Sequence, residues 1–249
     1  MDFIKEFYEV MEKRNPNFDV AGFLTKDDTV YPLTTDTKVL STVFELIARP
    51  IIYEIANKYG YQVYEPPQQN YYPDFTLMKD EDDDAKIAID IKTTYRDFRA
   101  DGTWRAKFTL GSYASFMRNG TKNIAFPYSE YIKHYIIGFI YTREEIGDIH
   151  MFKLKDRYKV VYPISDVEYF CQEKYKIADY RTGSGNTENI GSILASSVEE
   201  FKNGTGPFAE LGEEVFHDYW INFPRYRSTG HYRDLDGYFR WKKSLEESY

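Results

Sequence analysis

The chain has 249 residues, of which 42% are hydrophobic and 18% aromatic, and its formal net charge is −8. This length fits one domain with a sizeable core, no apolar run is long enough to span a bilayer, and the acidic balance argues against a protein that coats nucleic acid non-specifically. The first residues lack a signal-peptide pattern, and a single cysteine, Cys171, excludes an intrachain disulfide and a cysteine metal site. We therefore expect one soluble, cytoplasmic domain over residues 1–249, with Cys171 buried as a small hydrophobic residue.

The first elements along the chain are predicted from apolar spacing and capping residues. Apolar positions at helical spacing indicate a helix over residues 4–11. Short strands around a polar turn are expected over residues 18–33. Asp36 or Thr37 can cap a long helix that ends at Gly60.

Two charged residues of this long helix have alternative interpretations. Lys38 and Glu45 lie seven residues apart, so they share one helix face beside the apolar stripe. They are either two solvated charges, which is the simpler interpretation, or a phosphate contact and an acid near a metal. Pro50 is expected to bend or interrupt the helix.

Two expected strands carry the candidate catalytic residues. Isoleucines alternate with Ala88, Asp90 and Lys92 in the strand predicted over residues 86–95. Because successive side chains of a strand point to opposite faces, Asp90 and Lys92 project together, away from the isoleucines. Asp74 opens a second short strand and can lie beside Asp90 if the two strands pair. The acidic run between the strands indicates a solvated hairpin loop, since it lacks the spacing of a calcium loop.

The residue types at this position suit phosphodiester hydrolysis. One or two carboxylates hold Mg²⁺ in proteins together with waters and a substrate phosphate oxygen, and the ion lowers the pKa of a bound water. A lysine beside them stabilises developing negative charge. The spacing alone favours a simpler interpretation, in which Asp90 and Lys92 form an ordinary ion pair on a surface strand pair.

The remaining elements are placed more coarsely. Strands are expected over residues 62–64, 107–110 and 134–142, and helices over residues 167–178 and 210–223. His134 is expected to be structural. Residues 182–189 form a loop rich in Gly and small polar residues, but no Lys-Ser/Thr follows as in a P-loop. The basic residues after Phe223 are candidates for contacts with a DNA backbone.

Assembled in order, these segments resemble the EcoRV family of type II restriction endonucleases. The resemblance is carried by residues 36–42, 68–70, 72–77, 86–95, 183–187 and 189–193. It covers most of residues 18–195, and these runs in this order are far more specific than the Pro73-Asp74 and Asp90-Ile91-Lys92 motif alone.

The resemblance implies an α/β (α+β) fold with a central mixed β-sheet flanked by helices. It also implies a homodimer that uses Mg²⁺, with Mn²⁺ able to substitute, to cut double-stranded DNA within a palindrome. In this family the site is GATATC, cut to blunt ends with 5′-phosphates. The dimerisation part is expected at about residues 18–35 and 145–165, the remainder binding and cutting DNA, and a companion DNA methyltransferase is expected in the cell.

The resemblance also assigns roles to individual residues. Catalysis is assigned to Asp74, Asp90 and Lys92 with Glu45, and metal binding to Asp74, Asp90 and Glu45. Base recognition is assigned to Gly183, Gly185, Asn186, Thr187, Gln69 and Asn70. Contacts with the DNA backbone are assigned to Thr37, Lys38, Thr94, Lys122 and Asn189. The residue types fit, because Asn pairs with adenine and a Thr methyl contacts the thymine methyl.

Some segments depart from the family pattern, and other functions are compatible with the same fold. Residues 96–106 differ and look longer, residues 144–180 and the tail match poorly, and Glu188 adds an acid to the recognition loop. A non-catalytic DNA-binding protein is the alternative from another class, although the clustered acids argue against it. A repair or recombination nuclease is a third candidate, which the Gly-rich loop disfavours.

Overall fold

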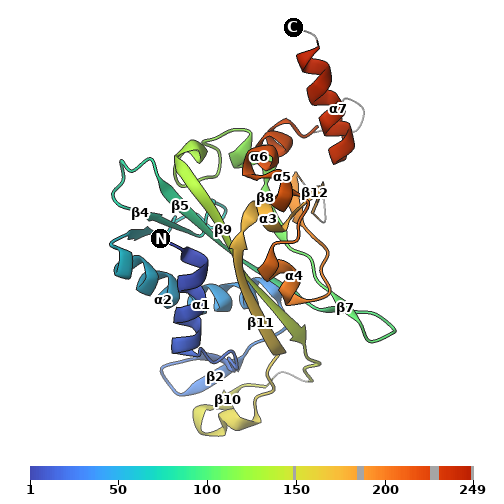
Figure 1. The fold of residues 1–249 in the computed structure, drawn as a ribbon. Helices are drawn as coiled ribbons and strands as arrows, with labels where there is room; N and C mark the ends of the chain where they lie inside the picture. Colours follow the sequence, from blue (N-terminus) through green and yellow to red (C-terminus); the bar gives the residue numbers. More distant parts are fainter. Residues whose placement is uncertain (148–149, 184–187, 225–229, 248–249) are drawn as a thin grey trace.

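Helices and strands are mixed along the chain in the computed structural model, which describes residues 1–147, 150–183, 188–224 and 230–247 (Figure 1). The helices are α1 (Phe3–Arg14), α2 (Thr37–Tyr59), α3 (Lys174–Ile177), α4 (Val198–Asn203), α5 (Phe208–Leu211), α6 (Glu213–Asn222) and α7 (Leu235–Glu246). The strands are β1 (Gly22–Leu24), β2 (Thr29–Pro32), β3 (Gln62–Tyr64), β4 (Phe75–Met78), β5 (Lys86–Tyr95), β6 (Asp97–Phe98), β7 (Trp104–Arg105), β8 (Thr109–Ser112), β9 (Tyr131–Arg143), β10 (Phe152–Lys153), β11 (Ile164–Glu173), β12 (Ala178–Thr182) and β13 (Asn189–Ser192).

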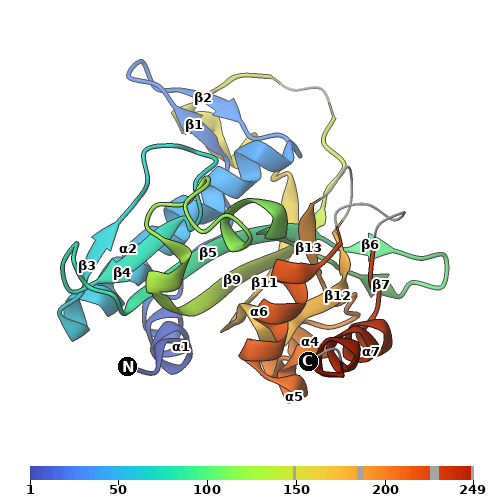
Figure 2. The same ribbon diagram turned by 90° about the horizontal axis from the view of Figure 1, so that it is seen from above.

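A five-stranded sheet in the order β11-β9-β5-β4-β3 forms the centre of the molecule. Strands β5 and β9 run parallel, whereas the other neighbouring pairs run antiparallel. Helices α1 and α2 lie on one face of this sheet, and α4, α5 and α6 lie beyond the other face (Figure 2). The predicted fold class, a mixed sheet flanked by helices, is confirmed.

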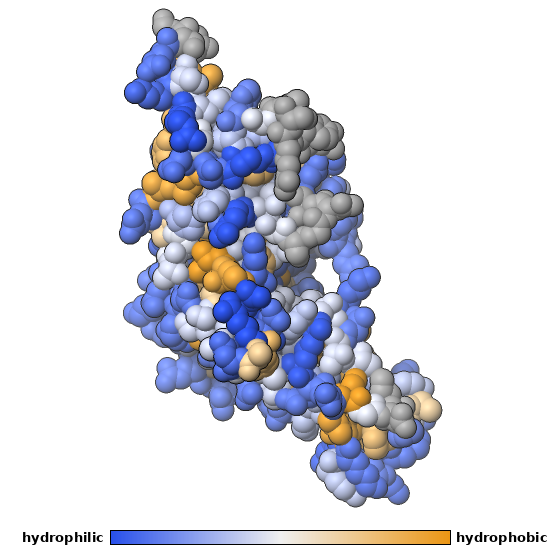
Figure 3. Space-filling view, turned by 90° about the vertical axis from the view of Figure 1, so that its right-hand side faces the viewer, coloured by the Kyte–Doolittle hydropathy of each residue, from blue (hydrophilic) through white to orange (hydrophobic). Residues whose placement is uncertain are grey.

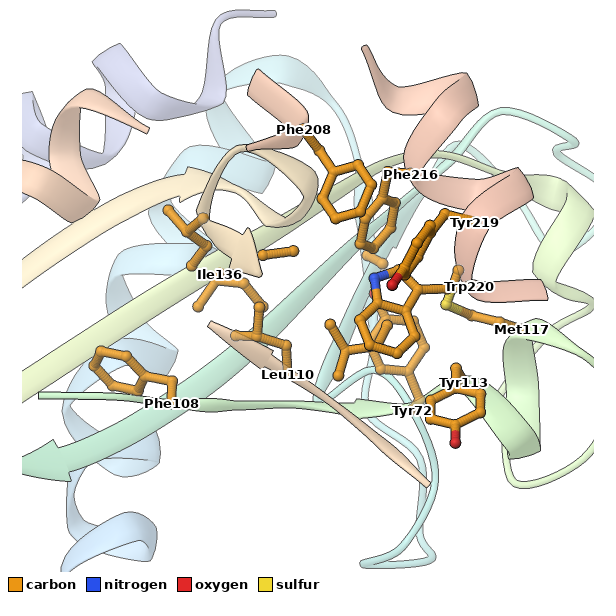
Figure 4. Close-up of a cluster of buried hydrophobic side chains, with 14 of the residues drawn as sticks. Tyr72, Phe108, Leu110, Tyr113, Met117, Ile136, Phe208, Phe216, Tyr219 and Trp220 are labelled. Carbon is orange, nitrogen blue, oxygen red and sulfur yellow. The ribbon is translucent and has the colours of Figure 1, made fainter. Parts of the chain in front are cut away.

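Each face of the central sheet is covered by its own hydrophobic core. Ile87, Ile89 and Ile91 of β5 pack with α1 and α2, whereas Ala88 belongs to the core on the opposite face. That second core is rich in aromatic rings, and Tyr219 and Trp220 of α6 lie within it (Figure 4). The alternation predicted for β5 is confirmed, so Asp90 is turned away from the isoleucines.

Helix α2 begins and ends where the capping residues predict. The Asp36 carboxylate accepts hydrogen bonds from the backbone N–H groups of Lys38 and Val39 at 2.9 and 3.2 Å, which satisfies donors that have no partner within the helix. Gly60 ends the helix in the left-handed conformation, with φ of 67°. Of the bend or interruption expected at Pro50, the interruption does not occur, because the helix continues through this residue.

The helix expected over residues 167–178 is wrong. Strand β11 occupies most of this segment and pairs antiparallel with β9, with Phe170 opposite Gly138 and Cys171 opposite Ile137. Phe170 enters one core and Cys171 the other, so both faces of the strand are apolar and the alternation that reveals a strand is lost. Only the four residues of α3 are helical. Cys171 is fully buried, as expected.

The carboxyl-terminal part also differs from the expectation. The helix predicted over residues 210–223 is divided at Gly212, whose φ of 95° is incompatible with a continuous helix, into α5 and α6. Helix α7 was not anticipated, and it packs Tyr238 against the aromatic core. None of the helices in the described ranges has the length and apolar character needed to cross a membrane.

The contact between Gly138 and Phe170 leads to a prediction on stability. A Cβ atom at Gly138 would lie 2.1 Å from the Phe170 ring, so Gly138→Ala is expected to destabilise the fold by about 1–3 kcal/mol. A lower midpoint of urea unfolding measures this effect. Gly147→Ala is the control, because a Cβ at Gly147 meets no atom within 4 Å. Equal midpoints for the two variants would contradict the prediction.

Candidate active site

Two neighbouring cavities open beside strands β4 and β5. The larger cavity, of about 830 Å³, is lined by residues that include Thr37, Lys38, Ser41, Glu45, Asp74, Lys92, Thr94 and Lys107. The smaller cavity, of about 430 Å³, is lined by residues that include Gln69, Asn70, Tyr72, Asp74, Asp90, Lys92, Gly111, Phe116, Lys122 and Asn189. Asp74 and Lys92 line both, so the two cavities meet at these side chains.

Pairing of β4 with β5 brings the three candidate catalytic residues together. The register places Phe75 opposite Ile89, so Asp74, one residue before β4, lies beside Asp90. The Asp74 Oδ2 atom accepts a hydrogen bond of 2.6 Å from the backbone N–H of Ile91. The Lys92 Nζ atom lies 2.7 Å from Asp90 Oδ2. The carboxylates of Asp74 and Asp90 and the ammonium group of Lys92 therefore lie close together beside the β4–β5 pair.

Burial and interactions between charges shift the pKa values of Asp74, Lys92 and Glu45. Burial raises the pKa of Asp74 well above its usual range, and the neighbouring Asp90 carboxylate raises it further. Burial alone would lower the pKa of Lys92, but attraction to Asp90 and Asp74 outweighs burial and raises it. Burial also raises the pKa of Glu45, which Lys92 partly counteracts. Ionisation of Asp74 and Glu45 is therefore unfavourable in the metal-free site, and a further cation would stabilise their ionised forms.

The donor set fits a hard divalent cation. The Asp90 Oδ2 atom is buried and accepts no hydrogen bond among the described residues, although the Lys92 ammonium is close to it. Two such carboxylates suffice for Mg²⁺, which keeps several waters. No group of three or more His, Cys, Asp or Glu side chains suited to a metal occurs in the part of the chain that the structure describes. Glu45 lies in the wall of the larger cavity and does not complete such a group with the two aspartates.

The other predicted site residues divide between the cavities. Thr37, Lys38 and Thr94, assigned to DNA backbone contacts, line the larger cavity. Gln69 and Asn70, assigned to bases, line the smaller cavity together with Lys122 and Asn189. Gly183 lies at the end of β12, where its N–H donates to the Asn189 carbonyl at 2.8 Å. The predictions for Gly185, Asn186 and Thr187 fall outside the described residues.

Sequence reasoning missed several residues that line the larger cavity. Ser41 follows Lys38 by three positions and precedes Glu45 by four, so its place on the same helix face was a usable signal. Its Oγ atom lies 2.9 Å from the Thr93 Oγ1 atom, in a hydrogen bond that links α2 to β5. Lys107 also lines this cavity, and its position next to β8 gave no comparable signal.

The sequence is similar to those of known restriction endonucleases. Residues 14–243 match the family model described as "Restriction endonuclease EcoRV". The chain is also 44% identical over 244 residues to "Type II restriction enzyme EcoRV" from Escherichia coli, a similarity that covers 96% of each chain.

Proposed function

The chain belongs to the EcoRV family of type II restriction endonucleases, which are site-specific deoxyribonucleases, and we propose that it cuts GATATC in double-stranded DNA to blunt ends, using Mg²⁺. The observation that carries the proposed metal-dependent cleavage is the meeting of Asp74, Asp90 and Lys92 at the junction of two cavities. The proposed site and the blunt ends are carried over from the family by similarity. We further propose that the protein acts in the cytoplasm, where a companion methyltransferase protects the host DNA.

Each residue of the site has a proposed role. Asp74 and Asp90 hold the divalent ion, with Glu45 as an auxiliary acid in the cavity wall. When bound there, the ion polarises the phosphodiester and lowers the pKa of a water. Lys92 holds the Asp90 carboxylate through its ion pair and stabilises the negative charge that develops on the phosphate oxygens. The expected products carry 5′-phosphate and 3′-hydroxyl ends.

Sequence recognition is proposed to divide between two loops. Gly183, Gly185, Asn186 and Thr187 read the major groove, where an Asn side chain pairs bidentately with adenine and a Thr methyl contacts thymine. Gln69 and Asn70 contact the minor groove, where base readout is poorer. Support comes from the smaller cavity, because Gln69 and Asn70 line it together with the candidate catalytic residues.

Contacts with the DNA backbone are proposed for residues at both cavities. Thr37, Lys38 and Thr94 serve from the larger cavity, and Lys122 and Asn189 from the smaller one. Such contacts fix the register of the protein on the duplex without reading its sequence.

We also propose that the protein acts as a homodimer through the small sheet of β1, β2 and β10. This sheet exposes large apolar side chains, since Phe23 is 54% and Leu24 57% exposed, and Figure 3 shows apolar surface at that end of the molecule. Two-fold symmetry would match the symmetry of a palindrome.

A double variant, Phe23→Asp with Leu24→Asp, is expected to convert the dimer to a monomer in analytical ultracentrifugation. Phe239→Asp, at an exposed aromatic residue of α7, is the control and should remain dimeric; a dimeric double variant would contradict the proposal.

Cleavage of a plasmid of known sequence tests the proposed activity. The plasmid is incubated with the protein in Mg²⁺ and, separately, in EDTA, and the ends of the products are sequenced. Blunt ends at GATATC that require Mg²⁺ are the expected result. Discrete ends at another sequence would reject the proposed site, and cleavage in EDTA would reject the role of the metal.

A further inference from the structure

Lys174 is a buried cation without a hydrogen-bonding partner. It is the first residue of α3, its exposed fraction is 1%, and its Nζ atom donates no hydrogen bond among the described residues. Burying an ammonium group without a carboxylate partner destabilises a fold by several kcal/mol in general. The groups around Lys174 should therefore show what the buried charge does in this protein.

The ammonium group of Lys174 lies directly behind the wall of the smaller cavity. Its Nζ atom is 4.6 Å from the ring centroid of Tyr72 and 4.8 Å from that of Phe116, and these two rings stack on each other. A Cβ atom on Gly111 would lie 3.8 Å from the same Nζ atom. Tyr72, Phe116 and Gly111 all line the smaller cavity, as does Asp90.

The charges around Lys174 belong to the candidate active site. Burial lowers the pKa of Lys174 to about 7, and attraction to Asp90 is the main opposing effect, whereas repulsion from Lys92 adds to the lowering. Burial lowers the pKa values of His134 on β9 and His217 on α6, and repulsion from Lys174 lowers them further. A phosphodiester in the cavity would favour the charged form of Lys174, because an anion nearby stabilises a cation.

Lys86 shows how this fold otherwise buries a lysine. It is fully buried at the start of β5, but its Nζ atom lies 2.7 Å from the Glu130 carboxylate and donates to the Glu81 carbonyl at 3.0 Å. Lys86 therefore has a carboxylate and a carbonyl partner. Lys174, which lies beside the candidate active site, has neither among the described residues.

We propose that Lys174 is a positioning residue of the active site: its charge, held behind the wall of the smaller cavity, orients the Asp90 carboxylate and stabilises the phosphodiester anion that enters. This inference rests on the proposed nuclease function. Tyr72 and Phe116 form a cation–π cradle that keeps the charge in place without neutralising it. The Asp90 carboxylate, whose Oδ2 atom lies 2.7 Å from the Lys92 ammonium, is the group on which the charge of Lys174 acts.

Lys174→Met tests the proposal, because methionine keeps the approximate shape and removes the charge. The metal-free melting temperature is expected to stay the same or rise, since an unpaired buried charge is lost. The single-turnover cleavage rate in Mg²⁺ is expected to fall by about 10- to 100-fold, as when a group that positions a metal ligand is removed. DNA affinity in EDTA, measured by fluorescence anisotropy, should change less than threefold.

Lys86→Met is the matched control, because it removes a buried lysine that is paired and lines neither cavity. It is expected to lower the melting temperature while the cleavage rate, measured well below that temperature, is unchanged. Lys174→Leu, which is also apolar and uncharged, provides a second variant with the same expectation as Lys174→Met. An unchanged rate in the Lys174 variants, or a rate that falls together with the melting temperature, would overturn the proposal. Wild-type cleavage in the same assay tests the nuclease function separately.

Discussion

Asp90→Ala is expected to lower the single-turnover rate of DNA cleavage on the order of a thousandfold. Asp90 pairs with Lys92 through its buried Oδ2 atom, at 2.7 Å from the lysine Nζ atom. Removing it takes away one of two proposed metal ligands and frees the lysine from its partner. The rate is measured on a short duplex that contains one GATATC site, with enzyme in excess over DNA.

The same variant should retain its fold and bind DNA at least as well without metal. Loss of a carboxylate reduces repulsion of the phosphates, so affinity in EDTA is expected to stay the same or increase. Asp218→Ala is the control, since Asp218 accepts from Tyr238 and pairs with Lys242 at 3.0 Å away from both cavities. A cleavage rate for Asp90→Ala equal to that of the control would remove Asp90 from the proposed catalytic centre.

Local patterns predicted the parts of the structure that position this site. The alternation of isoleucines with Ala88 and Asp90 fixed which face of β5 carries the acid, because a strand has a strict period of two. The capping residues Asp36 and Gly60 defined α2, because helix ends leave backbone groups that particular residues satisfy. These signals act over a few residues and need no knowledge of the rest of the chain.

Features that depend on distant pairing could not be predicted in the same way. Strand β11 is held by its hydrogen bonds to β9, and its two apolar faces mimic a buried helix in the sequence. Lys174 follows directly after this strand, so the wrong helix prediction also concealed a buried lysine behind the wall of the smaller cavity. The proximity of α2 residues such as Glu45 to the aspartates likewise arises only when the helix packs on the sheet.

Lys92→Met is expected to lower the cleavage rate by about 100- to 1,000-fold and also to destabilise the metal-free protein. The second effect arises because Asp90 loses its ion-pair partner while Asp74 remains beside it. Breaking a buried pair by removing one partner costs about 3 kcal/mol in other proteins. The free energy of unfolding, measured in EDTA by urea titration, reports this loss without any contribution from catalysis.

The pH dependence of this destabilisation identifies its cause. The pKa of Lys92 is raised, so its contribution to stability is fully present at neutral pH and is lost only as the pH rises through that raised value. The pKa of Asp74 is raised as well, so the fold favours its protonated form and stability falls as the carboxylate ionises. Without Lys92 the ionised carboxylates repel each other unopposed. The stability gap between wild type and Lys92→Met should therefore be larger at about pH 9 than at about pH 5.

A matched variant separates this effect from the general loss of a lysine. Lys5→Met removes an ammonium group that is 69% exposed and pairs at 3.6 Å with Glu9, itself 52% exposed, outside both cavities. Exposed pairs contribute about 0–1 kcal/mol, so its stability loss should be small and should not grow between the same two pH values. If the stability loss of Lys92→Met were equally independent of pH, Lys92 would not offset the repulsion between Asp74 and Asp90. The proposed divalent-cation site, which is inferred from that repulsion, would then lose its main electrostatic argument.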